Sequence, residues 1–315
     1  MSDAEFSSEL APLTRAATAT NRDEWFAAIE ALTEEEGYIQ PIGEKHWAFF
    51  WDAGTTLLVS FQTLDDIRAR PDQMPLAHSI ATDRGWSHLC LIADGPTWFR
   101  DIAVYRYFDR LVDETFLEDF DHVLFFGAGM GGYAACAYSV TAPGARILAL
   151  NPRATLEPVQ AGWDARDRAE RRLNFTARYG YAPDMLEGAA HAVVIHDPTI
   201  RVEAMHAALF RAPYISRLSA RHMGDQLDNA FDQIGILPDL IDGAMKGTLT
   251  AAAFASLWRK RRDFAPYLRN LLNKAESSGR IAHEVLICKN VSSRLRAPRF
   301  ARRLAKLTGA PIEAD

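Results

Sequence analysis

Short apolar runs alternate with helical patterns through the middle of the chain. Five runs that are nearly continuous in apolar side chains lie at residues 87–93, 122–126, 145–150, 191–195 and 212–218. Apolar residues at helical spacing occupy the segments between them, around residues 102–117, 132–140, 164–179 and 202–209. Continuous apolar strands separated by helices are typical of a mainly parallel sheet covered on both faces, so we expect an α/β fold.

The first part of the chain follows a different pattern. Residues 1–20 are small and polar without a period, and we expect a flexible arm there. Aromatic and aliphatic residues recur at helical spacing over residues 23–36 and predict a helix. Two aromatic and β-branched segments, 46–51 and 55–61, flank a turn sequence at residues 52–54 and predict a β-hairpin.

From residue 224 to the end of the chain, helical patterns occur without a strand signal. We therefore expect a sheet domain over residues 21–236 and a basic α-helical C-terminal segment over residues 237–315. Residues 254–315 contain 14 Lys and Arg against 5 Asp and Glu, a net +9, whereas the whole chain carries −6. A basic stretch without a binding motif identifies no partner, so nucleic acid is not expected. The charge favours a helical appendage beside an acidic domain, and a protein partner or a homo-oligomer stays open.

Composition narrows the class of protein. The chain has 315 residues, of which 48% are hydrophobic, as in ordinary globular proteins. The three cysteines, Cys90, Cys136 and Cys288, form no CxxC pair, which disfavours a disulfide framework or a cysteine-bound metal and fits a reducing compartment. No apolar run approaches 18 residues, and the acidic N-terminus is unlike a Sec-type signal. We expect a cytoplasmic protein that does not span a membrane.

The strongest local signal is the glycine turn at residues 127–132, GAGMGG, which joins a strand to a helix. Gly127, Gly129 and Gly132 satisfy the dinucleotide-binding pattern G-x-G-x-x-G, which would place the pyrophosphate of FAD or NAD(P) at a helix N-terminus. Two features count against this alternative. The next strand ends at Asn151 rather than at an acidic residue that could hold the ribose, and the pattern does not open the domain.

The same turn resembles the nucleophile elbow of the α/β-hydrolase superfamily, whose pattern is G-x-S-x-G. Residues 127–131 match every fixed position except the nucleophile, where Gly129 has no side chain. The family order is nucleophile, acid, histidine. The resemblance implies that Asp197, after the strand 191–195, is the acid, and that His222, after the strand 212–218, is the histidine.

The resemblance also implies an oxyanion or ligand site next to the elbow. The Met130 N–H and a backbone group near Gly95 would form it, and the side chain of Trp98 would shape a pocket. Each residue has a structural alternative as well: Asp197 as a helix cap or turn residue, His222 as a loop histidine, and Trp98 as a core aromatic.

Gly129 decides which chemistry is available. Covalent acyl transfer needs an oxygen or sulfur nucleophile, so standard serine-hydrolase catalysis is excluded. Three functions remain. The first, which we favour, is a non-catalytic binding or assembly protein that needs no cofactor. The second is general-base chemistry by a His222–Asp197 dyad on a small carbonyl or ester-like substrate. The third is nucleotide binding at the glycine turn.

The chain as a whole also looks similar to bacterial proteins labelled phosphoadenosine phosphosulfate reductase, in stretches such as residues 85–89 and 178–183. Its motifs do not support that label. Such a reductase carries an S-G-G-x-D-S phosphate loop and a catalytic cysteine near the C-terminus. Here the glycine turn holds neither serine nor aspartate, and Cys288 lies in a helical pattern without a neighbouring glycine or histidine motif.

Overall fold

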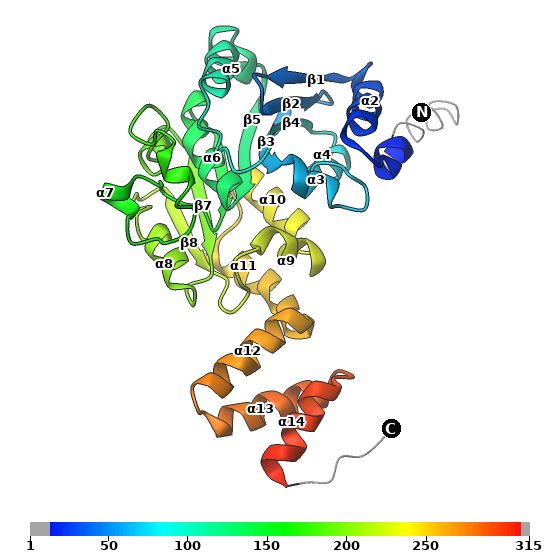
Figure 1. Ribbon diagram of the computed structural model, residues 1–315, viewed down its shortest axis with the longest axis vertical. Helices are drawn as coiled ribbons and strands as arrows, with labels where there is room; N and C mark the ends of the chain where they lie inside the picture. Colours follow the sequence, from blue (N-terminus) through cyan, green and yellow to red (C-terminus); the bar gives the residue numbers. More distant parts are fainter. Residues whose placement is uncertain (1–12, 310–315) are drawn as a thin grey trace.

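The computed structural model describes residues 13–309, which contain an eight-stranded sheet (Figure 1). The strands lie in the order β1-β2-β4-β3-β5-β6-β7-β8. Strands β3 to β8 are parallel, and β2 is antiparallel to both of its neighbours. The strand bounds are β1 (Gly37–Ile42), β2 (His46–Trp51), β3 (Thr56–Thr63), β4 (Ser87–Ala93), β5 (His122–Ala128), β6 (Arg146–Leu150), β7 (His191–His196) and β8 (Ile215–Ser219).

Helices cover both faces of this sheet. Helices α5, α6 and α8 contribute to the core on one face, and α4, α9, α10 and α11 to the core on the other. The α-helix bounds are α2 (Arg22–Thr33), α3 (Leu64–Arg68), α4 (His78–Thr82), α5 (Ile102–Asp113), α6 (Met130–Tyr138), α7 (Pro158–Ala161), α8 (Arg201–Ala207), α9 (Leu227–Gln233), α10 (Leu237–Met245), α11 (Ala251–Leu257), α12 (Ala265–Ser277), α13 (Ile281–Ser292) and α14 (Pro298–Thr308).

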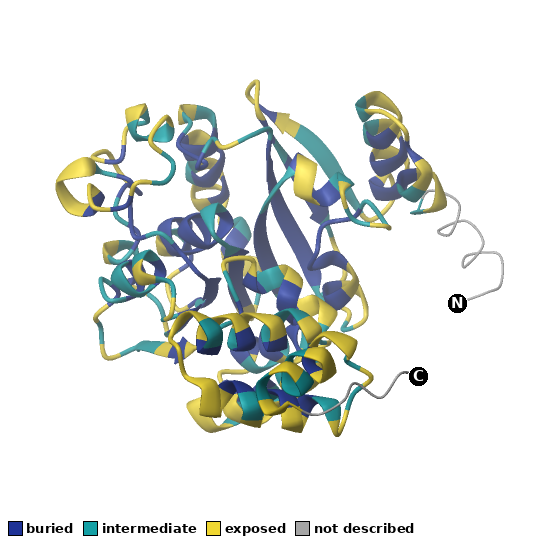
Figure 2. Cartoon of the chain, turned by 60° about the horizontal axis from the view of Figure 1, so that its bottom comes forward, coloured by how far each residue is buried: buried dark blue, intermediate teal, exposed yellow. Residues whose placement is uncertain are grey.

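Alternate positions of the central strands supply the two cores. Leu57, Val59 and Phe61 of β3 join one core, whereas Leu58 joins the other, as expected from the two-residue period of a strand. All seven residues of β4 are buried, and Figure 2 shows the central strands in the colour of buried residues. The predicted architecture, a mainly parallel α/β sheet with helices on both faces and a helical C-terminal segment, is therefore confirmed.

The predicted hairpin is wrong in its pairing. Strands β2 and β3 are not neighbours, because β4 lies between them and pairs with both. The observed hairpin is β1–β2, which turns at Gly43 with φ +68°. The sequence around residues 52–54 looks like a hairpin turn because both flanks are strands. It cannot reveal that a third strand, 24 residues further on, inserts between them.

The predicted helix over residues 164–179 is also wrong. This segment belongs to the long connection from β6 to β7 and forms turns with one short 3₁₀ stretch, Glu170–Arg172. Tertiary contacts hold its backbone. The buried guanidinium of Arg100 donates to the carbonyl oxygens of Asn174 and Arg178. These carbonyl oxygens therefore accept hydrogen bonds from a side chain and not from the backbone N–H groups of a helix.

The C-terminal helices divide into two groups. Helices α10 and α11 pack into the core of the sheet domain through residues such as Leu240 and Phe254. Helices α12 to α14, which we call the C-terminal unit, have a small core of their own and project from the main body (Figure 1). The expected boundary at residues 236 and 237 thus falls inside the sheet domain, because α10 completes the second face of the sheet.

The first twelve residues of the expected arm lie outside the described part of the chain. Residues 13–18 are helical, and Ala16 is fully buried in a cluster with Trp25 and Ile29. Residues 13–20 therefore do not form a loose arm. Within residues 13–309, no helix is both long and apolar enough to cross a membrane.

Candidate functional site

The glycine turn lies at the carboxyl end of β5, where the chain enters α6. Gly129 has φ 54° and ψ −113°, a conformation that L side chains rarely adopt. Its N–H donates to Leu150 O of β6 at 2.9 Å, and its carbonyl accepts from Tyr133 N at 3.0 Å. Both bonds fix the turn to the sheet and to the helix, so the strand-to-helix turn predicted from the sequence is present.

The three glycines of the elbow pattern have different steric environments. A Cβ atom at Gly127 would lie 2.2 Å from Gly131 O, and one at Gly131 would lie 2.3 Å from Phe61 O. Both glycines are needed because strand and helix approach each other closely. A Cβ atom at Gly129, in contrast, would meet nothing within 4 Å. The position that corresponds to the nucleophile in the G-x-S-x-G pattern is thus open space, and only the backbone conformation favours glycine there.

A cavity of about 230 Å³ opens beside Gly129. Its walls come from the end of β3, from the glycine turn and from the segment that leads into α9. The lining includes three carboxylates, Asp66, Asp225 and Asp228, and no Lys, Arg or His. Burial raises the pKa of Asp228, and the neighbouring Asp66 and Asp232 raise it further. Phosphate groups would meet uncompensated negative charge here, which disfavours a dinucleotide at Gly127, Gly129 and Gly132.

The expected oxyanion loop lies elsewhere in the fold. Gly95 follows β4, which is separated from β5 by β3, and it does not line the cavity beside Gly129. The strand end next to the elbow is that of β3. Trp98 is 3% exposed and packs against Tyr133 and Phe175. Its backbone N–H donates to Met130 Sδ at 3.1 Å.

Asp197 lies directly after β7 and is 1% exposed. One carboxylate oxygen accepts from the backbone N–H and the hydroxyl of Thr199, at 2.9 and 2.7 Å. The other accepts from Gly224 N at 2.9 Å. The carboxylate therefore ties the turn after β7 to residues 220–226, the histidine loop that follows β8. This arrangement corresponds to the structural alternative for Asp197.

His222 lies in the histidine loop with φ 63°. Within residues 13–309, no hydrogen bond or ion pair joins its ring to Asp197, and it does not line the cavity beside Gly129. Burial lowers the pKa of His222, Asp197 acts in the opposite direction, and Arg221 and Lys274 lower the pKa further. The ring faces a cavity shared with α12 and α13. The structure thus does not bring the predicted dyad together at Gly129.

A different histidine and aspartate do form a pair. Nε2 of His206 lies 3.0 Å from Asp164 Oδ2, and Ala154 N donates to its Nδ1. Both residues are buried, in an ionic cluster with Arg153, Arg166 and Glu203. Burial lowers the pKa of His206 to about 4. This buried pair joins the β6–β7 connection to α8, which is a structural role. No spacing in the sequence indicated it.

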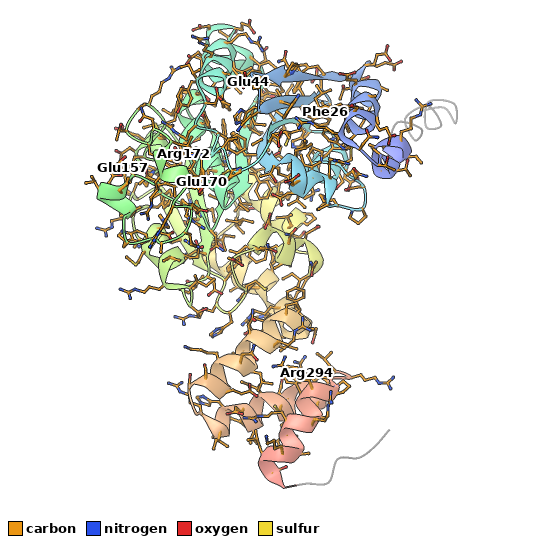
Figure 3. All side chains as sticks on the ribbon, in the orientation of Figure 1. Phe26, Glu44, Glu157, Glu170, Arg172 and Arg294 are labelled. Atoms are coloured by element: carbon orange, nitrogen blue, oxygen red, sulfur yellow. The ribbon has the colours of Figure 1, made fainter. Side chains whose placement is uncertain are left out.

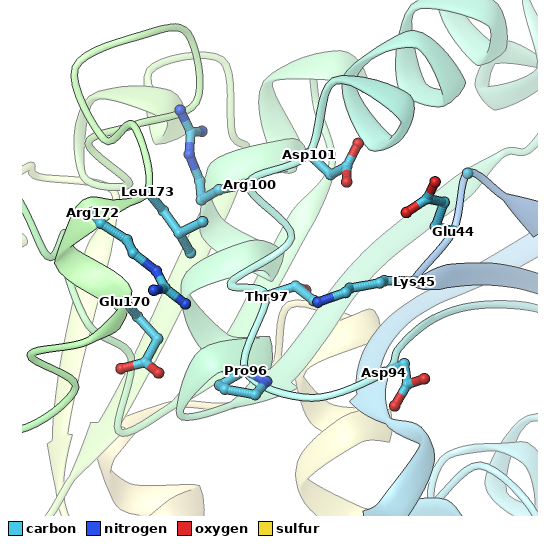
Figure 4. Close-up of a pocket in the computed structure, with 11 residues that line it drawn as sticks. Glu44, Lys45, Asp94, Pro96, Thr97, Arg100, Asp101, Glu170, Arg172 and Leu173 are labelled. Carbon is cyan, nitrogen blue, oxygen red and sulfur yellow. The ribbon is translucent and has the colours of Figure 1, made fainter.

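Another cleft, of about 510 Å³, lies beyond the end of β4 (Figure 4). Lys45 and Arg172 extend into it from opposite sides, while Asp101 and Glu170 also line it. Figure 3 places Glu170 and Arg172 on the main body, away from Arg294 on the C-terminal unit. Charges of both signs line this cleft, so it has no evident preference for the sign of a ligand. Within residues 13–309, no group of three or more His, Cys, Asp or Glu side chains could hold a metal ion.

Comparisons with known proteins give only distant similarities. No family model matches the chain, and no curated protein matches it. Among solved structures, it is similar to an esterase domain from Rhodothermus marinus, with 16% identity, a TM-score of 0.44, and coverage of 67% of this chain and 96% of that one. It is also similar to Est1E from Butyrivibrio proteoclasticus, with 12% identity, a TM-score of 0.45, and coverage of 68% and 99%. A third is an S-formylglutathione hydrolase from Agrobacterium tumefaciens, with 12% identity, a TM-score of 0.43, and coverage of 65% and 94%.

Proposed function

We propose that this chain is a non-catalytic binding protein built on an α/β-hydrolase-like sheet. One observation carries the proposal: the backbone turns as an elbow at Gly129, and the open space above it holds no nucleophile. An elbow without an oxygen or sulfur atom cannot form an acyl intermediate. The surrounding carboxylates cannot take over this role by pairing with a histidine, because none lines that cavity.

The general-base alternative has less support. A general base has to reach the proton that it abstracts within about 2.6–3.2 Å, or through one water molecule. Asp197 already accepts three hydrogen bonds from Thr199 and Gly224, and His222 faces another cavity. The assembled pair, His206 and Asp164, is buried away from solvent. None of these groups faces the elbow.

Thiol chemistry, which the reductase label would require, also has little support. Cys90, Cys136 and Cys288 are all fully buried. Burial raises the pKa of Cys90 to about 12 and raises the pKa of Cys136 and of Cys288. Because the thiolate is the reactive form, cysteines in such surroundings are inert. Cys288 packs in the core of the C-terminal unit, which is a structural role.

An ester and thioester turnover assay tests this proposal. The purified chain is offered p-nitrophenyl esters of two to eight carbons and the matching acyl thioesters, beside His222→Ala and a buffer blank. We expect all three samples to release product at the same background rate. Turnover by the wild-type chain that disappears in His222→Ala would contradict a non-catalytic role.

A further inference from the structure

A cavity of about 520 Å³ lies where the histidine loop meets the C-terminal unit. Its walls come from Thr199 after β7, from Arg221 and His222 in the histidine loop, and from α12, α13 and the turn between them. This volume lies in the range of small-molecule sites. A single hydrogen bond joins the histidine loop to α12 in the described chain, from Asn270 Nδ2 to His222 O at 3.1 Å.

The charges that line this cavity have one sign. Arg221, Lys274 and Arg280 line it together with His222 and His283, and the lining contains no carboxylate. Within residues 13–309, none of these three cationic side chains forms a salt bridge. This differs from the cleft beyond β4, where charges of both signs are present. Three unpaired cations around one cavity favour an anion.

The carboxylate that acts on the His222 ring and those of helices α12 to α14 are already engaged. The Asp197 carboxylate accepts hydrogen bonds from Thr199 and Gly224. On the C-terminal unit, Glu276 and Glu284 both pair with Arg303. No free carboxylate of the unit is therefore positioned to neutralise the cavity. Arg221 and Lys274 both lower the pKa of His222, which agrees with their position around its ring.

The other side of the cavity is apolar. Leu271 of α12 and Leu286 and Ile287 of α13 line it. Leu286 is 63% exposed, although large aliphatic side chains are usually covered. An apolar wall next to a cluster of cations matches a ligand that has an anionic end and an alkyl portion.

We infer that this cavity binds a small amphipathic anion. A carboxylate or phosphate headgroup would accept charge-assisted hydrogen bonds from Arg221, Lys274 and Arg280, and a short alkyl chain would lie along Leu271 and Leu286. This inference rests on the proposed binding function and names its ligand class. The ligand would bridge the histidine loop and the C-terminal unit. His222 thereby becomes part of a binding site instead of a catalytic dyad.

Isothermal titration of the full chain with decanoate, decyl phosphate and decyltrimethylammonium tests the inference. We expect saturable binding of at least one of the two anions with one molecule per chain, and no binding of the cation. The two anions distinguish a carboxylate site from a phosphate site. The double variant Arg221→Gln/Lys274→Gln should weaken binding by about tenfold or more, since it removes two charged donors.

The matched control removes the same number of positive charges from positions outside the cavity. Arg269 of α12 and Lys289 of α13 are exposed and do not line it. Arg269→Gln/Lys289→Gln should keep the affinity within about twofold. Equal weakening in both double variants, equal affinity for the cation, or no saturable binding of either anion would overturn the inference. The ester assay is independent of these results, so a failed titration leaves the non-catalytic role standing.

Discussion

Gly129 holds its unusual backbone conformation without steric cost, because it has no Cβ atom. Gly131, four residues into the turn, has an ordinary backbone but lies against the carbonyl of Phe61. Adding one methyl group therefore has a different physical consequence at each position. At Gly129 the cost is conformational strain, and at Gly131 it is overlap with the backbone of β3.

Urea denaturation of Gly129→Ala and Gly131→Ala measures this difference. We expect Gly129→Ala to lower the free energy of unfolding by about 1–3 kcal/mol, the usual range for a strained backbone. Gly131→Ala should lose more, because a Cβ atom 2.3 Å from Phe61 O forces the strand and the helix apart. A larger loss in Gly129→Ala than in Gly131→Ala would contradict the steric account.

Asp197 contributes to stability through two loops. Replacing it by alanine leaves Thr199 N and Gly224 N without their acceptor. We expect Asp197→Ala to lose about 1–3 kcal/mol of unfolding free energy, as for unsatisfied buried donors. The control is Asp225→Ala, whose side chain is exposed and which should stay within about 0.5 kcal/mol of the wild type. Similar losses in both variants would show that Asp197 has no special role.

At the scale of elements, the sheet was predictable where the sequence signal is local. Strands β4 to β7 are short and mainly apolar runs, and the glycine turn carries its own steric signal in Gly127 and Gly131. The pairing of β2 was not predictable, because β4, which follows β3 in the sequence, inserts between β2 and β3. The segment 164–179 has a helical pattern, but contacts with Arg100 determine its backbone.

The candidate site was predictable only in part. The missing nucleophile follows directly from Gly129 in the sequence. The cavity that the His222 side chain lines cannot be predicted from the sequence, because it depends on how α12 packs beside the histidine loop. The pairing of His206 with Asp164 joins positions 42 residues apart in two different connections, and it also depends on tertiary structure.

The helices of the C-terminal unit share a core of their own, formed by residues such as Leu272, Cys288 and Phe300. We therefore expect a chain that ends at Phe264 to keep a cooperatively folded sheet domain, because α10 and α11 remain in place. Calorimetry should show a melting temperature within a few degrees of the full chain, and circular dichroism a loss of helix. Loss of the cooperative transition would show instead that the unit is required by the main body.

At the scale of the whole molecule, buried histidines couple stability to pH. Burial lowers the pKa of His46, His78 and His206, each to about 4. Between about pH 6.5 and pH 4 the unfolded chain binds more protons than the native one. The stabilising contribution is therefore complete above about pH 6.5 and is lost as the pH falls toward 4.

Urea denaturation at about pH 7.5 and about pH 5 measures this dependence. The free energy of unfolding should fall on acidification, by up to about 1.4 kcal/mol per pH unit for each histidine. His206→Gln should flatten the dependence, and His122→Gln, at an exposed position, should leave it unchanged. A stability that is constant over this range, or that rises on acidification, would contradict neutral buried histidines.

A non-catalytic role of the whole molecule requires that no activating base lies at the elbow. The most direct measurement is intact-mass analysis of Gly129→Ser after treatment with a fluorophosphonate, which reacts with base-activated serines. The added side chain has space at this position, so the variant offers a hydroxyl at the nucleophile position of the G-x-S-x-G pattern. The account predicts no labelling beyond that of Gly129→Ala, because His222 faces the other cavity. Stoichiometric labelling of Ser at this position, lost when His222 is also replaced, would contradict the central claim.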